Sequence, residues 1–200
     1  MSEIFTIDLN KSKQNQKITV HEFYYSKSCN KDSMSLPKIS YQFTTSYFGE
    51  TLIMSNEIGL CGLAFCDHFG RDAALDDMKL RWPKASYKKD TIFSDKEFKS
   101  ILDQTKRVEL CLIGSNLQIQ VWKALLKIPF GKVISYTTLA KHIGKPKSVR
   151  TVATAIGKNP LCWLIPCHRV LRANGELGGY HWGLNVKKNM LTYESQINKI

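Results

Sequence analysis

Acidic residues are scarce in the second part of this chain. Residues 114–200 contain thirteen Lys and Arg but only two acids, Glu176 and Glu194, and therefore carry a net charge of +11. Residues 1–113 contribute only +1 to the total of +12. So uneven a distribution favours a surface that binds a polyanion, most commonly nucleic acid, over charge that merely keeps the protein in solution.

The sequence also lacks long hydrophobic runs. No stretch approaches the ~18 consecutive apolar residues that indicate a membrane span. A basic segment followed by an apolar one, the pattern of a secretory signal, is missing from residues 1–17. We therefore expect no membrane association and an intracellular location, in the cytoplasm near the nucleoid if the source is bacterial. The six cysteines are then expected to be reduced thiols rather than a disulfide framework.

The apolar content is sufficient for a folded core. Of the 200 residues, 43% are hydrophobic, enough for one large domain or two small ones, so disorder of the whole chain is excluded.

Residues 1–38 are polar and weakly patterned, with short strands conceivable at 4–7 and 21–25, and form an N-terminal extension of unknown role. Residues 39–113 predict a small α/β (α+β) domain. Its strands are expected at 39–45, 49–55, 59–66 and 108–113, and its helices at 72–82 and 93–104, the second capped by Ser94.

Residues 114–200 predict a second, mainly helical domain. Its last two helices are separated by the short turn 145–147, and this succession is typical of a helix-turn-helix. The outward residues of the last helix are small, and Arg150 stands among them. This helix can approach a DNA duplex closely or pack tightly against its own core, and the sequence alone leaves both open. The helices are expected at about 116–128, 136–143 and 148–156, the second capped by Ser135.

One segment carries the residues best suited to chemistry. It reads Leu164-Ile-Pro-Cys-His-Arg-Val170. Pro166 fixes its own φ and favours an extended backbone before it, so the chain is stiff just ahead of Cys167. His168 could favour the thiolate, but neighbours in an extended segment point to opposite sides, so we expect a water to bridge the two side chains. An ordinary buried thiol is the alternative for an isolated Cys-His pair.

Pro166-Cys-His-Arg-Val170 resembles the active-site signature of the O6-alkylguanine-DNA alkyltransferases, also called methylated-DNA–protein-cysteine methyltransferases. The resemblance continues in order over residues 39–193, so it does not depend on one short motif. The Gly-Tyr-x-Trp-Gly form is most similar to that of the C-terminal half of the bacterial Ada proteins. Further matching blocks are Val121-Trp-Lys-Ala-Leu125, Ser135-Tyr136, Gly144-Lys-Pro-Lys147, Asn159-Pro160 and Gly178-Gly-Tyr-His-Trp-Gly183.

This resemblance implies a fold and a reaction. The fold would be a small ribonuclease H-like α/β domain followed by a winged-helix or helix-turn-helix domain that binds DNA. The protein would act as a monomer, without cofactor or metal, through the minor groove of double-stranded DNA that carries O6-alkylguanine. It would flip the damaged base out of the duplex and transfer the alkyl group irreversibly to its own cysteine, in a single-turnover suicide reaction.

The resemblance also assigns catalytic roles. Cys167 would accept the alkyl group, and His168 would draw the thiol proton through water. Glu194 would orient that imidazole, and Asn159 would brace the turn around the site. Without the resemblance, Glu194 would be interpreted as a solvated carboxylate and Asn159 as part of an ordinary turn.

Five further residues would handle the DNA and the base. Arg150 would fill the space that the flipped base leaves, and Tyr136 would press on the neighbouring phosphate. The guanine pocket would be lined by Val170, Tyr180 and His181. Simpler roles for the first two are a phosphate contact for the arginine and an interface position for the tyrosine. Weaker candidates for contacts with the DNA backbone are Lys147, Arg169 and Arg172.

Some positions depart from the family pattern. Cys162 and Trp163 replace apolar residues beside the pocket, which leaves open whether Cys162 is a second reactive thiol or a packed side chain. His181 stands where the family varies, so the pattern does not define the preferred alkyl group or activity on O4-alkylthymine.

Two other functions compete with alkyl transfer. An alkyltransferase-like protein binds lesions without repairing them, but such relatives typically lack the cysteine at the position of Cys167. A thiol hydrolase would turn over repeatedly and would leave the charge of +11 unexplained. No structural metal is expected at Cys61, Cys66 and His68, because Cys-x4-Cys-x-His is not a usual zinc spacing.

Overall fold

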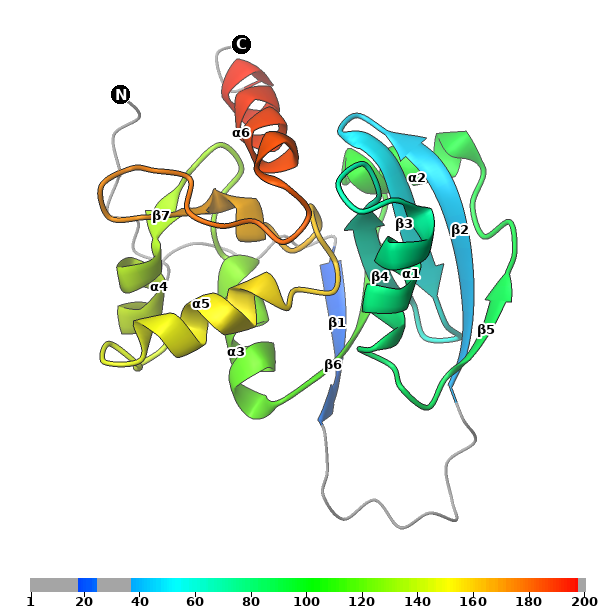
Figure 1. Cartoon of the computed structure of the whole chain (residues 1–200), viewed down its shortest axis with the longest axis horizontal. Coiled ribbons are helices and arrows are strands. Elements are labelled where there is room, and N and C mark those ends of the chain that lie inside the picture. Colours follow the sequence, from blue (N-terminus) through cyan, green and yellow to red (C-terminus); the bar gives the residue numbers. More distant parts are fainter. Residues whose placement is uncertain (1–17, 25–36, 198–200) are drawn as a thin grey trace. The chain divides into compact units, whose positions relative to one another are not determined.

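The computed structural model describes residues 18–24 and 37–197. These residues form two compact units that divide between Asn116 and Leu117 (Figure 1). The first unit is built on a mixed β-sheet and the second consists mainly of helices, so the predicted α/β fold class is confirmed. In this part of the chain, no helix combines the length and the apolar character needed to cross a membrane.

A mixed sheet forms the centre of the first unit. Its strands are β1 (Ile18–Tyr24), β2 (Lys38–Ser46), β3 (Gly49–Ser55), β4 (Leu60–Phe65), β5 (Ser86–Lys89) and β6 (Val108–Gly114). Among the described residues their order is β1-β6-β4-β3-β2-β5. β2, β3 and β4 form an antiparallel meander, β1 and β4 run parallel to β6, and β5 runs parallel to β2. The helices of this unit are α1 (Arg71–Lys79) and α2 (Asp95–Leu102).

Burial explains the central strands. All six residues of β4 are buried, and β3 buries its four central residues, Thr51–Met54, so these strands run through the core. Gly49 opens β3 with a φ of +111°, which favours glycine. A Cβ at this position would clash with the carboxylate of Asp67, whose Oδ1 accepts a hydrogen bond from the Glu50 amide at 3.0 Å.

The first helix is shorter than the predicted range 72–82. It ends at Lys79, and Leu80, which lies inside the predicted range, is 78% exposed. Trp82 is buried beyond the end of the helix, because its indole donates a hydrogen bond to the Cys61 carbonyl at 3.3 Å. Beyond Lys79 the chain continues in i→i−3 hydrogen bonds, in which the amides of Arg81 and Trp82 donate to the carbonyls of Met78 and Lys79.

The second helix begins where its cap predicts. The Ser94 hydroxyl accepts from the Glu97 amide at 3.4 Å, and the Glu97 carboxylate accepts from the Ser94 amide at 3.1 Å, so the two residues form a capping box. The cap is confirmed, although the helix spans residues 95–102 rather than 93–104.

Two strands at the edges of the sheet differ from the expectation. β1 pairs with β6 over seven residues and lies within the segment 1–38, to which the sequence assigns no role. It starts at Ile18, earlier than the expected strand at 21–25, and the expected strand at 4–7 lies outside the described residues. β5 was not predicted, because Ser-Tyr-Lys-Lys at a sheet edge offers only Tyr87 as an apolar residue.

The second unit has a hydrophobic core of its own. It contains α3 (Asn116–Leu125), β7 (Ile134–Ser135), α4 (Tyr136–His142), α5 (Val149–Gly157), a 3-10 helix (Cys167–Arg169), β8 (Val170–Leu171) and α6 (Leu184–Ile197). α4 packs against α5, and β7 pairs in parallel with β8. The Trp122 indole donates to the Ala155 carbonyl at 2.9 Å and so ties α3 to α5.

The ends of these helices follow local rules. Ser135 caps α4 as predicted, since its hydroxyl accepts from the Thr138 amide at 3.0 Å. Gly144 ends the helix region with a φ of +72°. α3 stops at Leu125, before the expected end at Ile128, because the next residues tighten into i→i−3 hydrogen bonds ahead of a proline.

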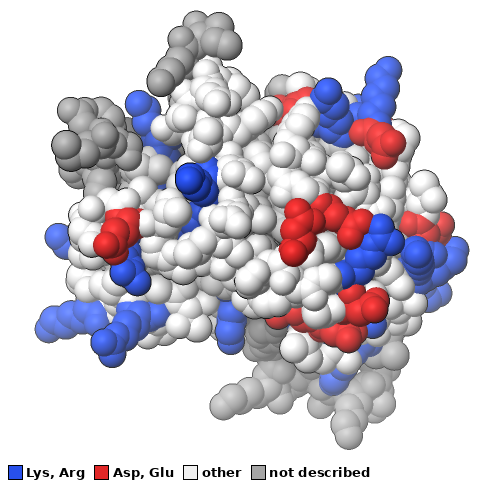
Figure 2. Space-filling view, turned by 45° about the horizontal axis from the view of Figure 1, so that its top comes forward, with Lys and Arg blue, Asp and Glu red and all other residues white. Residues whose placement is uncertain are grey.

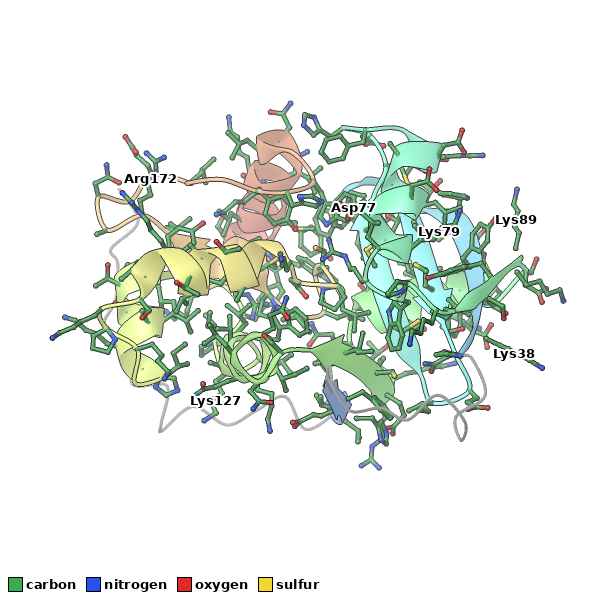
Figure 3. All side chains as sticks on the ribbon, turned by 60° about the horizontal axis from the view of Figure 1, so that its bottom comes forward. Lys38, Asp77, Lys79, Lys89, Lys127 and Arg172 are labelled. Carbon is green, nitrogen blue, oxygen red and sulfur yellow. The ribbon has the colours of Figure 1, made fainter. Side chains whose placement is uncertain are left out.

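The charges divide between the two units as they do along the sequence. On the face shown in Figure 2, the acidic side chains lie mostly over the unit of residues 17–116, whereas Lys and Arg dominate over the other unit. Lys38, Lys79 and Lys89 extend from the ribbon of the sheet unit and Lys127 from that of the helical unit (Figure 3). The helical unit therefore presents the basic surface that its composition predicts.

Candidate functional site

Cys167 begins the 3-10 helix of the second unit, at the end of a tight turn. All residues from Asn159 to Leu171 are buried. The prediction of an extended Cys-His segment is wrong, because Cys167 and His168 lie in a helical turn in which the Arg169 amide donates to the Pro166 carbonyl at 3.1 Å. The two side chains are directed by this turn rather than by a strand.

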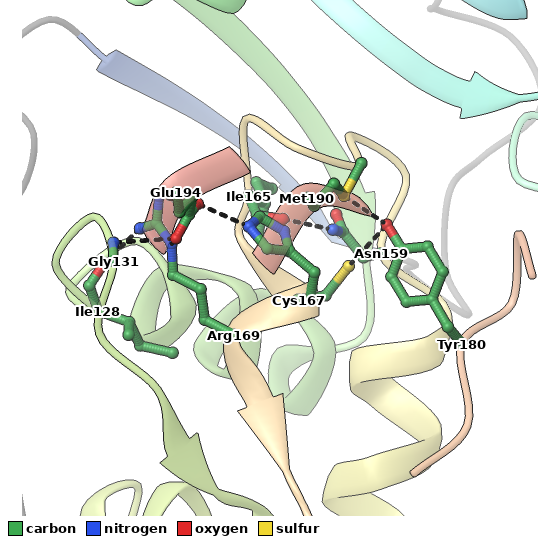
Figure 4. Close-up of polar contacts among 10 residues, drawn as sticks. Ile128, Gly131, Asn159, Ile165, Cys167, Arg169, Tyr180, Met190 and Glu194 are labelled. Carbon is green, nitrogen blue, oxygen red and sulfur yellow. Dashed lines mark hydrogen bonds and ion pairs between the residues drawn. The ribbon is translucent and has the colours of Figure 1, made fainter. Parts of the chain in front are cut away.

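The side chain of Asn159 holds the turn at both ends. Its Nδ2 donates to the Ile165 carbonyl at 2.8 Å (Figure 4), and its Oδ1 accepts from the Leu161 amide at 3.0 Å. The Ile165 amide in turn donates to the Leu161 carbonyl at 2.9 Å. At the tip, Trp163 has a φ of +71°, a left-handed conformation that costs a non-glycine residue roughly 1–3 kcal/mol. Cys167 is thus held by a turn whose strain is offset by these hydrogen bonds.

The Cys167 thiol lies among groups that favour its anion. Its Sγ is 4.0 Å from the Sγ of Cys162 and 3.9 Å from the Tyr180 hydroxyl. Hydrogen bonds with Cys162, Asn159 and Tyr180, together with the charge of Lys187, outweigh burial and lower the pKa of Cys167 to about 7. A large fraction of this thiol is therefore thiolate near neutral pH, which is the reactive form of cysteine.

His168 is completely buried and is held by its Nε2. This atom lies 2.8 Å from Oε1 of Glu194 (Figure 4). The ring stacks on the Trp163 indole, with centroids 5.4 Å apart and an interplanar angle of 13°. Burial lowers the pKa of His168 more than Glu194 raises it, so the imidazole is neutral at pH 7. An ionised carboxylate can only accept hydrogen bonds, so Nε2 of His168 carries the proton and Nδ1 is unprotonated. This Nδ1 is buried and has no hydrogen-bond partner within residues 18–24 and 37–197.

Glu194 is a buried carboxylate with several donors, not a solvated one. Oε1 accepts from Arg169 Nη2 at 2.8 Å, and Oε2 accepts from the Gly131 amide at 2.9 Å. Burial raises the pKa of Glu194, but the hydrogen bonds and charges of His168 and Arg169 outweigh it and bring the pKa to about 2. The carboxylate is therefore ionised at every physiological pH.

The partners of Arg169 correct one expectation. Its guanidinium is buried, pairs with Glu194, and donates through Nη1 to the Ile128 carbonyl at 2.6 Å. The prediction that Arg169 contacts the DNA backbone is therefore wrong. Arg172, by contrast, is exposed at the outer side of its loop (Figure 3), where it pairs with Glu176 at 2.8 Å.

A cavity of about 790 Å³ opens beside Cys167. Four of the five residues expected to handle DNA and base line it, namely Tyr136, Arg150, Tyr180 and His181. The fifth, Val170, is fully buried in β8 and is not among the lining residues. Catalytic and base-handling candidates that are far apart in the sequence thus meet at one opening of the helical unit.

Two buried residues of α6 contact tyrosines that line this cavity. The Lys187 ammonium is buried, donates to the Val170 carbonyl at 2.7 Å and to the Leu177 carbonyl, and lies 5.9 Å from the centroid of the Tyr136 ring. Burial lowers the pKa of Lys187 to about 8. The Sδ of Met190 accepts from the Tyr180 hydroxyl at 3.6 Å. Sequence reasoning missed both residues, although Lys187, Met190 and Glu194 follow one another at helical spacing on α6.

Metal ligands do not gather in the described part of the chain. Among residues 18–24 and 37–197, no three His, Cys, Asp or Glu side chains come close enough to hold a metal ion. Cys61 and Cys66 are buried free thiols, and His68 is exposed.

The basic helical unit follows a sheet unit, and a cysteine next to a neutral histidine lies at its cavity. This arrangement resembles that of the alkyltransferase class. Comparisons with known proteins agree with this. Residues 116–196 match the family model described as the 6-O-methylguanine DNA methyltransferase, DNA binding domain. The probable methylated-DNA–protein-cysteine methyltransferase of Acanthamoeba polyphaga mimivirus is 44% identical over 101 residues, which are 50% of this chain and 67% of the viral protein.

Longer relatives and solved structures agree as well. The regulatory protein Ada of Salmonella typhimurium is 37% identical over 164 residues, 79% of this chain but 46% of Ada, so the chain spans about half the length of that relative. The crystal structure of the O6-methylguanine methyltransferase of Mycobacterium tuberculosis matches with a TM-score of 0.65 and 30% identity, over 79% of this chain and 93% of that one. The chain belongs to the methylated-DNA–protein-cysteine methyltransferase family, the O6-alkylguanine-DNA alkyltransferases.

Proposed function

We propose that this protein repairs DNA by direct damage reversal. It flips an O6-alkylguanine out of double-stranded DNA and transfers the alkyl group to the Sγ of Cys167, once and irreversibly. The observation that carries the proposal is the position of Cys167 at the cavity, 3.9 Å from the Tyr180 hydroxyl and next to the neutral His168. A relative of solved structure, the OGT of Mycobacterium tuberculosis, was crystallised in complex with DNA, which supports the choice of partner.

The chain's own residues provide each step of the proposed reaction. The thiol proton of Cys167 passes through a water to the free Nδ1 of His168, and Glu194 stabilises the imidazolium that forms. The thiolate attacks the alkyl carbon in line, a C–S bond forms, and the bond from that carbon to O6 breaks. Burial raises the pKa of Tyr136, so its hydroxyl is protonated and can donate to the leaving guanine. A thioether has no easy return to a thiol, so the protein acts once and needs no cofactor.

The helical unit supplies the DNA-binding surface in this proposal. α4, the turn after it and α5 act as a helix-turn-helix within a winged-helix domain of residues 114–200. Thr151 and Thr154 on α5 are small and exposed beside the exposed Arg150, which supports close approach to the minor groove. Arg150 fills the space of the flipped base, and Tyr136 favours its rotation. Residues 39–113, together with β1, form the ribonuclease H-like domain, and the protein acts as an intracellular monomer.

Intact-protein mass spectrometry tests the transfer directly. The protein is mixed with one equivalent of a duplex that carries a single O6-methylguanine, and the tryptic peptide of residues 159–169 is then fragmented. We expect one added methyl group on Cys167 and an equal loss of the lesion. Specific lesion binding without a mass change would instead favour an alkyltransferase-like recognition protein, and repeated turnover would favour a hydrolase.

The role of Arg150 can be separated from the chemistry. We expect Arg150→Ala to slow transfer from duplex DNA by about 100-fold, because no side chain then fills the space that the flipped base leaves in the stack. The rate with free O6-benzylguanine should change by less than about twofold. Rates on the two substrates are compared in single-turnover assays. Lys188→Ala, which removes one exposed charge from α6, is the matched control. Equal losses on both substrates would show that Arg150 does not act in flipping.

The pH profile reports the thiol. With the pKa of Cys167 at about 7, the thiolate fraction and the rate with free O6-benzylguanine are expected to rise about tenfold between pH 6 and pH 8 and then level off. Removal of a stabilising hydrogen bond in Cys162→Ala should move the midpoint to higher pH, whereas Cys66→Ala in the sheet unit should not. Stopped-flow rates across this range measure both. A flat profile would mean that thiolate formation does not limit the reaction.

A further inference from the structure

The cavity holds a second thiol that forms no bond to the alkyl group in the proposed transfer. The Sγ of Cys162 lies 4.0 Å from the Sγ of Cys167, and both side chains line the cavity. Both cysteines are free thiols, with exposed fractions of 2% and 5%. The other described cysteines, Cys61, Cys66 and Cys111, belong to the sheet unit.

The backbone fixes the closeness of the two sulfurs. Asn159 pins the turn that separates them, through the Leu161 amide and the Ile165 carbonyl. The Cys162 thiol also lies 3.9 Å from the Asn159 carbonyl, which anchors it on the same turn. The contact therefore follows from a constrained loop and not from two mobile side chains that happen to meet.

We propose that Cys162 is a resolving thiol for Cys167, with which it forms a reversible disulfide after a peroxide has oxidised Cys167. This inference rests on the proposed function in one respect: the disulfide masks the alkyl acceptor only if Cys167 is that acceptor. The formation of the bond itself does not depend on DNA.

The chemistry balances with a peroxide as the oxidant. The Cys167 thiolate attacks one oxygen of hydrogen peroxide, the O–O bond breaks, and a sulfenic acid and hydroxide result. The Cys162 sulfur then attacks the sulfenic sulfur, so that an S–S bond forms and the S–O bond breaks. The leaving hydroxide takes the Cys162 proton as water. Overall, two thiols lose two electrons and two protons, and one peroxide becomes two waters.

The two sulfurs are close, and the other described thiols are less reactive. A disulfide needs its sulfurs about 2.0 Å apart, so a gap of 4.0 Å must close, and the open cavity that both side chains line leaves space for that movement. Burial raises the pKa of Cys61, Cys66 and Cys111, which keeps those thiols protonated and slow to oxidise. Among the described cysteines, peroxide should therefore react first at Cys167.

A peptide map tests the inference on the full chain. The reduced protein is first assayed for methyl transfer, then treated with a small excess of hydrogen peroxide, and its remaining thiols are blocked with N-ethylmaleimide. Trypsin releases residues 159–169 as one peptide, in which Cys162 and Cys167 are the only cysteines. We expect this peptide to be two hydrogens lighter and unblocked, and we expect dithiothreitol to restore both its blocking and methyl transfer.

The variant Cys162→Ser tests whether Cys162 protects Cys167 from further oxidation. It keeps a hydroxyl in place of the thiol, and we expect its Cys167 to proceed to sulfinic acid, with at least about tenfold less transfer recovered by dithiothreitol than in the parent protein. Cys66→Ser, changed in the sheet unit, should behave like the parent.

The possible failures are distinguishable. Sulfinic acid at Cys167 in the parent protein to the same extent as in Cys162→Ser, or a disulfide that leaves Cys162 blocked, overturns the inference. Absence of transfer by the reduced protein overturns the proposed function instead, while the mass of the 159–169 peptide still decides whether the disulfide forms.

Discussion

Replacing Cys167 with alanine is expected to abolish methyl transfer while lesion binding remains. The thiol is the only group of the proposed reaction that bonds to the alkyl carbon, so its loss removes the acceptor rather than slowing a step. The change deletes one sulfur atom at the edge of a cavity, where the remaining side chains can adjust. The measurement is the fraction of O6-methylguanine lost from a duplex after prolonged incubation with excess protein, alongside a gel-shift assay of lesion binding.

The matched control is Cys66→Ala, which removes a buried thiol from the sheet unit and should retain full stoichiometric transfer. A methyl group found on Cys162 in the Cys167→Ala protein would show that the second thiol can also be reached by the substrate. Undiminished transfer to any other residue would refute Cys167 as the acceptor.

Glu194→Gln is expected to have the second-largest effect, on both stability and rate. The substitution leaves the Arg169 guanidinium buried without a counter-charge, and breaking a buried ion pair in this way typically costs about 3–5 kcal/mol. It also removes the charge that stabilises the His168 imidazolium, so transfer should slow by about 100-fold or more. Urea unfolding and single-turnover kinetics at neutral pH measure the two effects separately.

A second ion pair of the same kind gives the control. Arg172 and Glu176 also lie 2.8 Å apart, but both side chains are mostly exposed, and solvent screens such pairs so that they contribute little to stability. Glu176→Gln should therefore leave stability and rate nearly unchanged. A similar loss in both variants would show that burial of the Glu194 carboxylate is not what matters.

Lowering the pH should show how much the Glu194 carboxylate contributes to the stability of the unmodified protein. Because the pKa of Glu194 is about 2 in the folded state and its ordinary value is 4.5, the folded state binds fewer protons in this range. The stability that this difference provides, about 3 kcal/mol, is fully present above pH 4.5 and is lost as the pH falls towards 2. His168 acts in the same direction from its ordinary value of 6.5 downwards, since burial disfavours its protonation. In Glu194→Gln the decline between pH 4.5 and 2 should be shallower.

Local patterns predicted much of the fold. Ser94 and Ser135 cap helices as expected because capping depends on neighbouring residues, and the central strands follow apolar runs bounded by glycine. Edge elements were harder to predict: β5 is held by pairing with β2 rather than by its own apolar residues. Residues 18–24 form a strand because β6 offers a partner far along the chain, and nothing in their composition reveals that partner.

The main residues of the candidate site were predicted, but several of the hydrogen bonds and ion pairs among them were not. The resemblance pointed to Cys167, His168 and Glu194, and the last two meet at 2.8 Å. It did not indicate that Arg169 turns inward to the same carboxylate, because an arginine in a basic segment gives no sign of burial. Lys187 was missed for the same reason. Such long-range pairings depend on how α6 packs, which no local pattern contains.

The position of Glu194 also has a consequence for the order in which the site comes into being. His168 is added to the growing chain 26 residues before Glu194 of α6, and until Glu194 is added the imidazole has no carboxylate partner. The nascent chain therefore carries the thiol without the machinery that sets its reactivity. Synthesis of this helix completes the candidate site, and a chain that stopped short of it would contain Cys167 without the carboxylate of Glu194.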